Sequence, residues 1–243
     1  MKKKLITALS GLKDCYVAGG AITSLHTNSP INDYDIYPKS EVALEYAIQW
    51  AFESGWWCVH QSNRSITFAD KDGSNLQIMI FDSFESTEKI FGFFDFTICM
   101  GAFDLDTQEF ILHENFLIHN SQRFLSFNKG TKYPYQSAWR VRKYEERGYT
   151  IGKMEYFKIL FACQMCPVDS WDKLKDQIGG IYGEAMVVPE DKEFSLEAAF
   201  EAMETLRPVD PVGLYSSWEV AVTAISNRPM RFVEGNPPKT YTL

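Results

Sequence analysis

Two aspartates, Asp33 and Asp35, are separated by one residue within a short stretch that also holds Ile31 and Ile36. In a β-strand, residues two apart point to the same face, so the stretch predicts two carboxylates side by side. Such carboxylates repel each other unless a cation lies between them or one of them takes up a proton. Mg²⁺ prefers oxygen ligands and is often held by one or two carboxylates together with substrate phosphates. The pair therefore predicts a metal site, for Mg²⁺ or Mn²⁺, that serves phosphate chemistry.

A glycine pair, Gly19-Gly20, follows the apolar run 15–18 upstream of these aspartates. Glycine permits a tight turn in which backbone N–H groups approach a phosphate. A helix that begins near Ala21 would place its N-terminus, which favours anions, at the same position. The glycine turn and the aspartate pair together indicate phosphoryl transfer. Either of them alone is equally compatible with an ordinary Gly turn or an Asp-rich turn.

The first half of the chain alternates apolar runs with a helical pattern, which is typical of a mixed α/β arrangement with a sheet as its core. Ser40 is a suitable N-cap for a helix over 41–54, which Gly55 would end. We expect strands at 15–18, 31–37, 57–60, 65–69, 76–81 and 110–112. The glycine pair directly follows the first of these strands, and the aspartate pair lies in the second.

The second half differs in charge and in pattern. Basic residues outnumber acidic ones between Arg123 and Lys158, and the balance turns acidic beyond Pro167. We expect helices over 136–147, 153–163, 195–206 and 211–227. The sequence therefore predicts an α+β protein with a head domain at residues 1–125, built on a mixed sheet flanked by helices, and a smaller, mostly helical domain at residues 126–243.

The composition limits the classes of function. A net charge of −8 over 243 residues argues against a general nucleic-acid coat, although it leaves room for a local basic groove. The five cysteines are odd in number and mostly lie in apolar surroundings, which favours reduced thiols in a cytosolic protein. No apolar run is long enough to cross a bilayer. We therefore predict a cytoplasmic protein without a membrane partner.

Three segments together resemble one known family. The pattern Gly19-Gly20, Asn28-Ser29-Pro30, Asp33-x-Asp35 is similar to the head domain of class II poly(A) polymerases and CCA-adding tRNA nucleotidyltransferases, within the DNA polymerase β superfamily. The segment 95–104 resembles a second motif of that family, whose Asp contacts the nucleotide sugar. The segment 134–149 resembles its neck helix. The resemblance implies a polymerase β-like nucleotidyltransferase head with Asp95 orienting the ribose.

Several positions depart from the family pattern. Thr23-Ser24 stands where the family has Arg-Asp after the glycine turn, so either hydroxyl would have to contact the phosphate. Gln77 takes the place of a third carboxylate, and it offers a carbonyl oxygen but no charge. Asp82 would serve instead only if a bulge turned it to the other face of its strand. The residues that read the base in the family fall at positions 132–133, so the choice of nucleotide does not transfer.

The resemblance implies transfer of a nucleoside monophosphate from an NTP to a hydroxyl, with an RNA 3′ end, as in tRNA, as the expected acceptor. The implied catalytic residues are Asp33, Asp35 and Gln77. The nucleotide would contact Gly19, Gly20, Thr23, Ser24, Asp95, Arg140, Arg142 and Lys143. The last three would also contact RNA, unless they form a solvated helix face. The alternatives are transfer to a protein or small molecule, and a binding or regulatory protein that has lost turnover.

Overall fold

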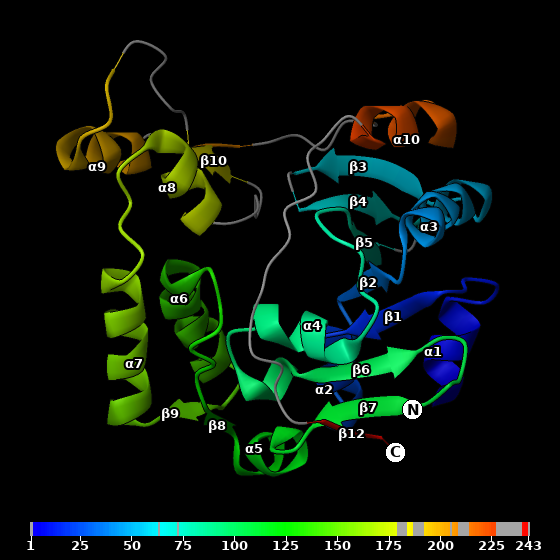
Figure 1. Ribbon diagram of the computed structural model, residues 1–243, viewed down its shortest axis with the longest axis horizontal. Coiled ribbons are helices and arrows are strands. Elements are labelled where there is room, and N and C mark those ends of the chain that lie inside the picture. Colours follow the sequence, from blue (N-terminus) through cyan, green and yellow to red (C-terminus); the bar gives the residue numbers. More distant parts are fainter. Residues whose placement is uncertain are drawn as a thin grey trace.

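A mixed sheet forms the centre of the molecule, with its strands in the order β12-β7-β6-β1-β2-β5-β4-β3 (Figure 1). The computed structural model describes residues 2–62, 64–71, 73–178, 184–186, 192–204, 206–208, 214–226 and 240–242. The strands are β1 (Cys15–Ala18), β2 (Asp33–Pro38), β3 (Trp57–Gln61), β4 (Ser65–Ala69), β5 (Asn75–Met79), β6 (Gly101–Asp104), β7 (Phe110–His113) and β12 (Thr240–Thr242). The predicted α+β class, with a mixed sheet flanked by helices, is confirmed.

The sheet is mixed because β2 and β5 run parallel while every other neighbouring pair is antiparallel. The chain leaves β2, crosses over through α3 (Glu41–Glu53), and returns through the β3–β4 hairpin to place β5 beside β2. Ser40 caps α3 as predicted, since its hydroxyl accepts a hydrogen bond from the backbone N–H of Ala43.

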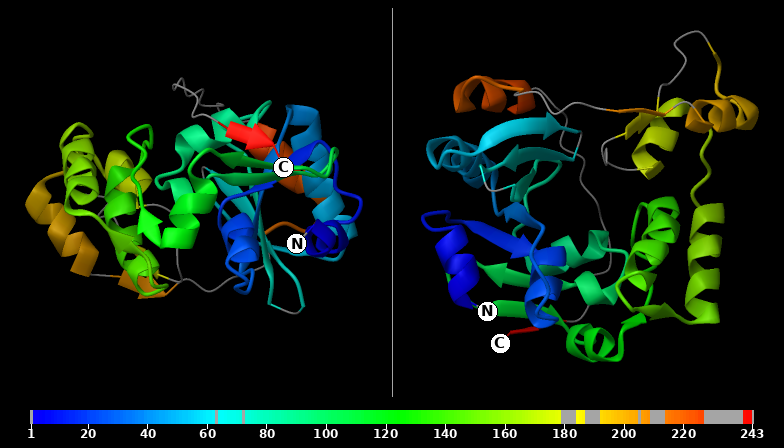
Figure 2. Two further views of the ribbon diagram at one scale, coloured as in Figure 1. Left: turned by 90° about the horizontal axis from the view of Figure 1, so that it is seen from below. Right: turned by 180° about the vertical axis from the view of Figure 1, so that it is seen from behind.

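Helices cover both faces of the sheet. The helices α1 (Lys2–Ala8), α2 (Gly20–His26), α3 and α10 (Trp218–Ser226) pack on one face, where Val17 and Ile36 are fully buried. The helix α4 (Thr87–Phe93) packs on the other face, together with Ala18 and Tyr37. Figures 1 and 2 show α2 and α4 on opposite sides of the strands. Because side chains alternate along a strand, β2 directs Asp33 and Asp35 to the α4 face.

The remaining helices lie beside the sheet rather than over it (Figures 1 and 2). They are α5 (Phe116–Gln122), α6 (Pro134–Glu145), α7 (Lys153–Gln164), α8 (Trp171–Ile178) and α9 (Leu196–Glu204), with a 3₁₀ turn at Thr97–Cys99. Short strands join them in pairs, β8 (Phe124–Leu125) with β9 (Thr150–Ile151) and β10 (Glu184–Met186) with β11 (Leu206–Pro208). A separate apolar cluster around Phe96, Val141 and Ile159 holds α6 and α7 to the head.

The end of the chain returns to the head. Ala221 and Ile225 of α10 join the core beneath α3, and β12 pairs with β7. The predicted helix over 211–227 is observed at 218–226, while 211–213 and 227 lie outside the described residues. The division at residue 125 stays a prediction, but part of the segment after it packs on the sheet. None of the helices that the structure describes is both long and apolar enough to cross a membrane.

Candidate nucleotide and metal site

The two aspartates of β2 lie on one face of the sheet, as the alternation predicted. Asp35 is paired with Ala18 of β1 on one side and with Gln77 of β5 on the other, and Asp33 is paired with Asn75. Gln77 therefore stands directly beside Asp35, at the position where the sequence resemblance implied a third carboxylate. Within the described residues no group of three or more His, Cys, Asp or Glu side chains is placed to hold a metal ion. Among these residues the two aspartates form a pair without a third acidic partner.

The glycine turn lies directly against both carboxylates. Gly19 follows β1 with φ +78° and ψ −133°, a conformation that only glycine adopts readily. A Cβ atom at Gly19 would lie 3.4 Å from Oδ2 of Asp35, and one at Gly20 would lie 3.9 Å from Oδ1 of Asp33. The missing side chains keep the backbone within reach of a group held by the two aspartates.

The carboxylate pair is electrostatically strained when no cation is present. Burial, and then the neighbouring Asp33 carboxylate, raise the pKa of Asp35 from 3.8 to about 8, against the opposing effects of Arg140 and Lys143. A raised pKa means that the pair tends to hold a proton near neutral pH. A divalent cation would relieve the same repulsion, so the donor set fits Mg²⁺ with the remaining oxygen ligands from water and phosphate.

A second acidic group, Asp95, lies just beyond the end of α4 and is 4 % exposed. Oδ2 of Asp95 lies 3.3 Å from Nε of Arg140 on α6 in an ion pair, while Oδ1 is buried without a hydrogen-bond partner in the part of the chain that the structure describes. Arg140 also donates from Nη2 to the hydroxyl of Tyr144 at 2.7 Å. Burial raises the pKa of Asp95, and Arg140 opposes this effect. An unpaired buried oxygen of this kind would accept a hydrogen bond from a ligand hydroxyl.

The structure extends the site along the sheet to residues that the sequence analysis missed. Gln77 is paired with Thr67 on β4, and Thr67 with His60 on β3, so a polar row runs from Asp35 across four strands. At the usual strand spacing this row is about 14 Å long. Nε2 of His60 is buried without a hydrogen-bond partner among the described residues, and burial lowers the pKa of this imidazole. A bulge between Cys58 and His60 turns His60 to this face, which simple alternation would not predict.

Two of the predicted nucleotide-binding residues are placed elsewhere. The hydroxyl of Thr23 is buried and donates to the carbonyl oxygen of Ile98 at 2.7 Å, so it fastens α2 to the motif at 97–99 and is not available to a phosphate. Arg142 is 75 % exposed and forms an ion pair with Glu146. The reason is helical geometry, since position 142 lies about 160° around α6 from position 140. Both assignments stay predictions, and these contacts do not support them.

Lys143 and Ser24 are two further residues of the predicted nucleotide site. Lys143 lies on α6 near the aspartates, and Asp33 is among the charges that act on its ammonium group. Partial burial, followed by the positive charges of Arg140 and Arg147, lowers the pKa of Lys143. Lys143 is therefore placed to meet negative charge at the site. The role of Ser24 stays a prediction.

The structure also shows the contacts of Asp82 and Phe94. Asp82 does not form a metal-holding group with Asp33 and Asp35 among the described residues. Its Oδ1 accepts hydrogen bonds from the Lys89 ammonium at 2.9 Å and from a neighbouring backbone N–H. Phe94 lies directly before Asp95 in the chain. Its ring lies 3.4 Å from the Cβ position of Gly19 and packs edge-on against Tyr37. The wall beside the glycine turn is therefore apolar.

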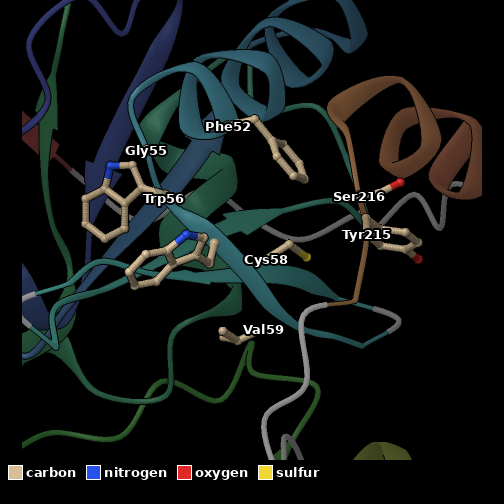
Figure 3. A pocket seen from close by; sticks show the side chains of 8 residues that line it. Phe52, Gly55, Trp56, Cys58, Val59, Tyr215 and Ser216 are labelled. Atoms are coloured by element: carbon tan, nitrogen blue, oxygen red, sulfur yellow. The ribbon is translucent and has the colours of Figure 1, made fainter.

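A hollow of 380 Å³ lies at the other edge of the sheet, between α3, β3 and the segment at 214–216 (Figure 3). Its lining is aromatic and uncharged, with Phe52, Trp56, Trp57 and Tyr215. Burial raises the pKa of the Cys58 thiol in its wall to about 11, so that group stays neutral. None of the described residues that line the hollow carries a positive charge.

Comparison with known proteins relates the chain to proteins described as Gabija anti-defense 2. Residues 1–123 match the family described as Gabija anti-defense 2 family protein. A protein of Bacillus phage SPbetaL7 named Gabija anti-defense 2 is 39% identical over 203 residues, which cover 82% of this chain and 50% of that protein. The chain therefore spans about half the length of this curated relative.

Solved structures with a similar fold are enzymes that act on tRNA. The Thermotoga maritima CCA-adding enzyme complexed with tRNA has a TM-score of 0.52 at 16% identity, over 83% of this chain and 50% of the enzyme. A tRNA nucleotidyltransferase complexed with a primer tRNA and an incoming ATP analog has a TM-score of 0.50 at 15% identity, over 68% of this chain and 50% of that one. At these identities the likeness establishes the fold, which is that of the nucleotidyltransferases.

Proposed function

The chain belongs to the Gabija anti-defense 2 family, and from that premise we propose that it is a divalent-metal-dependent nucleotidyltransferase whose activity serves the anti-defense role for which its relatives are named. In the proposed reaction, a hydroxyl of the acceptor attacks the α-phosphorus of an NTP. The bond from that phosphorus to the bridging oxygen breaks, pyrophosphate leaves, and the hydroxyl proton goes to solvent. The fold supports this reaction class.

One observation carries the proposal. The carboxylates of Asp33 and Asp35 share a face of β2 and lie directly against the Gly19-Gly20 turn. A cation would relieve the repulsion between two acidic groups this close, and a backbone turn without side chains can bind a phosphate through its N–H groups. The combination favours a site that holds Mg²⁺ and a triphosphate together over a structural Asp-rich turn.

Each side chain has a stated role in the proposed reaction. Asp33 and Asp35 would hold the metal, which when bound neutralises phosphate charge and makes the acceptor hydroxyl more acidic. Asp95 would accept a hydrogen bond from a ribose hydroxyl through its unpaired Oδ1. Lys143 would add positive charge near the phosphates. Gln77 would contribute a neutral oxygen ligand or a hydrogen bond beside Asp35.

We propose an RNA 3′ hydroxyl as the first acceptor to test. The likeness to enzymes solved with tRNA motivates this choice. The charges give it limited support, because Arg140 is engaged with Asp95 and Arg142 points to solvent. Lys143 lies where the charge of Asp33 acts on it. If RNA is not labelled, the same assay would report transfer to a hydroxyl on a protein or a small molecule.

The experiment incubates the purified protein with each α-labelled NTP, Mg²⁺ or Mn²⁺, and either total RNA or a cell lysate freed of RNA. Label in RNA supports the RNA acceptor, and label in protein or a small molecule supports transfer with a different acceptor. Asp35→Asn should abolish transfer while the protein remains folded. Asp169→Asn is the matched control, because Asp169 is a largely exposed carboxylate on the helical side that pairs with Lys173. Unchanged transfer by the Asp35→Asn protein would contradict the metal assignment.

One observation favours a second candidate, a protein that binds the nucleotide without turnover. Gln77 stands in register beside Asp35 where a third carboxylate is expected, so less metal charge is compensated there. This candidate predicts NTP binding without release of pyrophosphate for any acceptor. It also predicts that Gln77→Glu raises transfer above background, whereas an active enzyme adapted to glutamine should lose activity on the same change.

A further inference from the structure

The helix α7 has two apolar faces on opposite sides. Ile159 is fully buried against α6 and anchors the inner face. On the outer face Met154, Phe157, Phe161 and Met165 are 70, 40, 61 and 85 % exposed. A helix that packs on a protein surface needs one apolar stripe, directed to the core. The second stripe, which we call the outer stripe, has no such explanation.

The outer stripe is continuous and straight. Its four residues follow at intervals of three, four and four, and at 3.6 residues per turn they lie within about 80° of one another around the helix. The stripe is about 16 Å long at 1.5 Å per residue. Phe157 and Phe161 already contact each other, with ring centroids 6.3 Å apart. Lys158 lies beside the stripe and pairs with Glu155, so the nearest charges neutralise each other.

The outer stripe faces away from the rest of the described structure. In Figure 1, α7 lies at one side of the molecule, below α9, and α6 lies between α7 and the head. Methionine and aromatic side chains are enriched where proteins associate, and contiguous exposed patches of them mark interaction sites. The outer stripe is therefore a candidate interface.

We propose that the outer stripe pairs with the same stripe of a second copy of this chain, with the two α7 helices antiparallel across a two-fold axis. The order of the stripe, Met-Phe-Phe-Met, reads almost the same in both directions. A two-fold axis near the middle of α7 sets Phe157 against the partner's Phe161, and Met154 against the partner's Met165. Each side then meets an equal in size and polarity, as an isologous contact requires.

The exposed area reaches the lower limit for such a contact, because two stripes together offer on the order of 1,000 Å². Large apolar side chains bury about 150–250 Å² each, so the exposed fractions of these four leave on the order of 500 Å² in the stripe. A stable interface buries about 800 Å² per partner. Exposed neighbours such as Leu160 would supply more of the remaining area. The inference is independent of the proposed nucleotidyl transfer, because no residue of that site takes part.

The first test is the oligomeric state of the purified chain by sedimentation equilibrium. We expect a dimer whose dissociation constant rises at least 100-fold in Phe161→Glu, since two charges would be buried per dimer. Phe200→Glu is the matched control, because Phe200 on α9 is 65 % exposed but lies outside the stripe. Circular dichroism confirms that both variants are folded. A wild-type monomer at high concentration, or a dimer that Phe161→Glu leaves intact, would overturn the proposal.

The second test measures the direction of the pairing by disulfide cross-linking in a background with Cys163→Ser and Cys166→Ser. In this background, a chain with both Met154→Cys and Met165→Cys should form a covalent dimer under mild oxidation. Met154→Cys alone should not, because an antiparallel pair separates the two copies of position 154 by about 16 Å. Cross-linking by the single variant, or none by the double variant, would refute the antiparallel arrangement.

Discussion

Substitution of Gly19 by alanine should show whether the glycine turn requires a backbone conformation that only glycine adopts readily, or merely a small side chain. Gly19 has φ +78° and ψ −133°, and its neighbour Gly20 has no positive φ and begins α2. The two positions are adjacent, equally conservative to change, and both within 4 Å of the aspartate pair. Gly20→Ala is therefore a matched control for Gly19→Ala.

The magnitudes follow from the two conformations. A residue with a Cβ in the conformation of Gly19 costs of order 1–3 kcal/mol. The new Cβ would also lie 3.4 Å from both Oδ2 of Asp35 and the ring of Phe94, which is a tight contact. At Gly20 the nearest atom is 3.9 Å away, and alanine in place of glycine favours a helix by up to about 1 kcal/mol. The two variants should differ in stability by about 2–4 kcal/mol.

The assay is chemical denaturation of both variants and of the wild type, with thermal unfolding as a second readout. For a chain of this length, a loss of 2 kcal/mol lowers Tm by about 4–8 °C. Gly19→Ala should also weaken NTP binding, because relief of the contact moves either the turn or the Asp35 carboxylate. Equal stability of Gly19→Ala and the wild type would refute the reasoning, as would equal losses in the two variants.

Three other predictions concern the same site. The pKa of Asp35 is about 8 in the folded chain and 3.8 in the unfolded chain, so the folded state binds more protons between these pH values. Without metal, the free energy of unfolding should therefore fall as pH rises from 4 to 8, by up to about 1.4 kcal/mol per pH unit. Asp35→Asn should flatten this slope in a series of denaturation measurements. Arg140→Met should cost about 3–5 kcal/mol because it leaves Asp95 buried without its cation, and adding Asp95→Asn should restore most of the loss in a double-mutant cycle. Thr23→Val should cost about 1–2 kcal/mol through the lost hydrogen bond to Ile98, with the KM for NTP unchanged; a raised KM would return Thr23 to the phosphate site.

The sequence was sufficient for the features that depend on local pattern. Period-two alternation predicts that Asp33 and Asp35 share a face of their strand, and the structure places them there. The capping preference of Ser40 predicts the start of α3. These predictions succeed because a strand or a helix cap is determined by a few adjacent residues.

Features that depend on pairing between distant segments required the tertiary structure. The bulge in β3 turns His60 into the row of Gln77 and Thr67, whereas unbroken alternation would direct it to the core. The register of α6 directs Arg140 to Asp95 and Arg142 to solvent, and two basic residues separated by one position in a sequence do not reveal which of them faces the head.

The pair Asp33 and Asp35 shows most clearly what the sequence determines and what the tertiary structure decides. Residue type and spacing determined that two carboxylates would lie side by side with a glycine turn upstream. Only the packed sheet decided that the turn touches those carboxylates, that Gln77 is their lateral neighbour, and that Phe94 forms the wall beside them. The physical reason is that alternation along a strand is a local property of the backbone, whereas the contents of a site depend on which strands and helices are buried together.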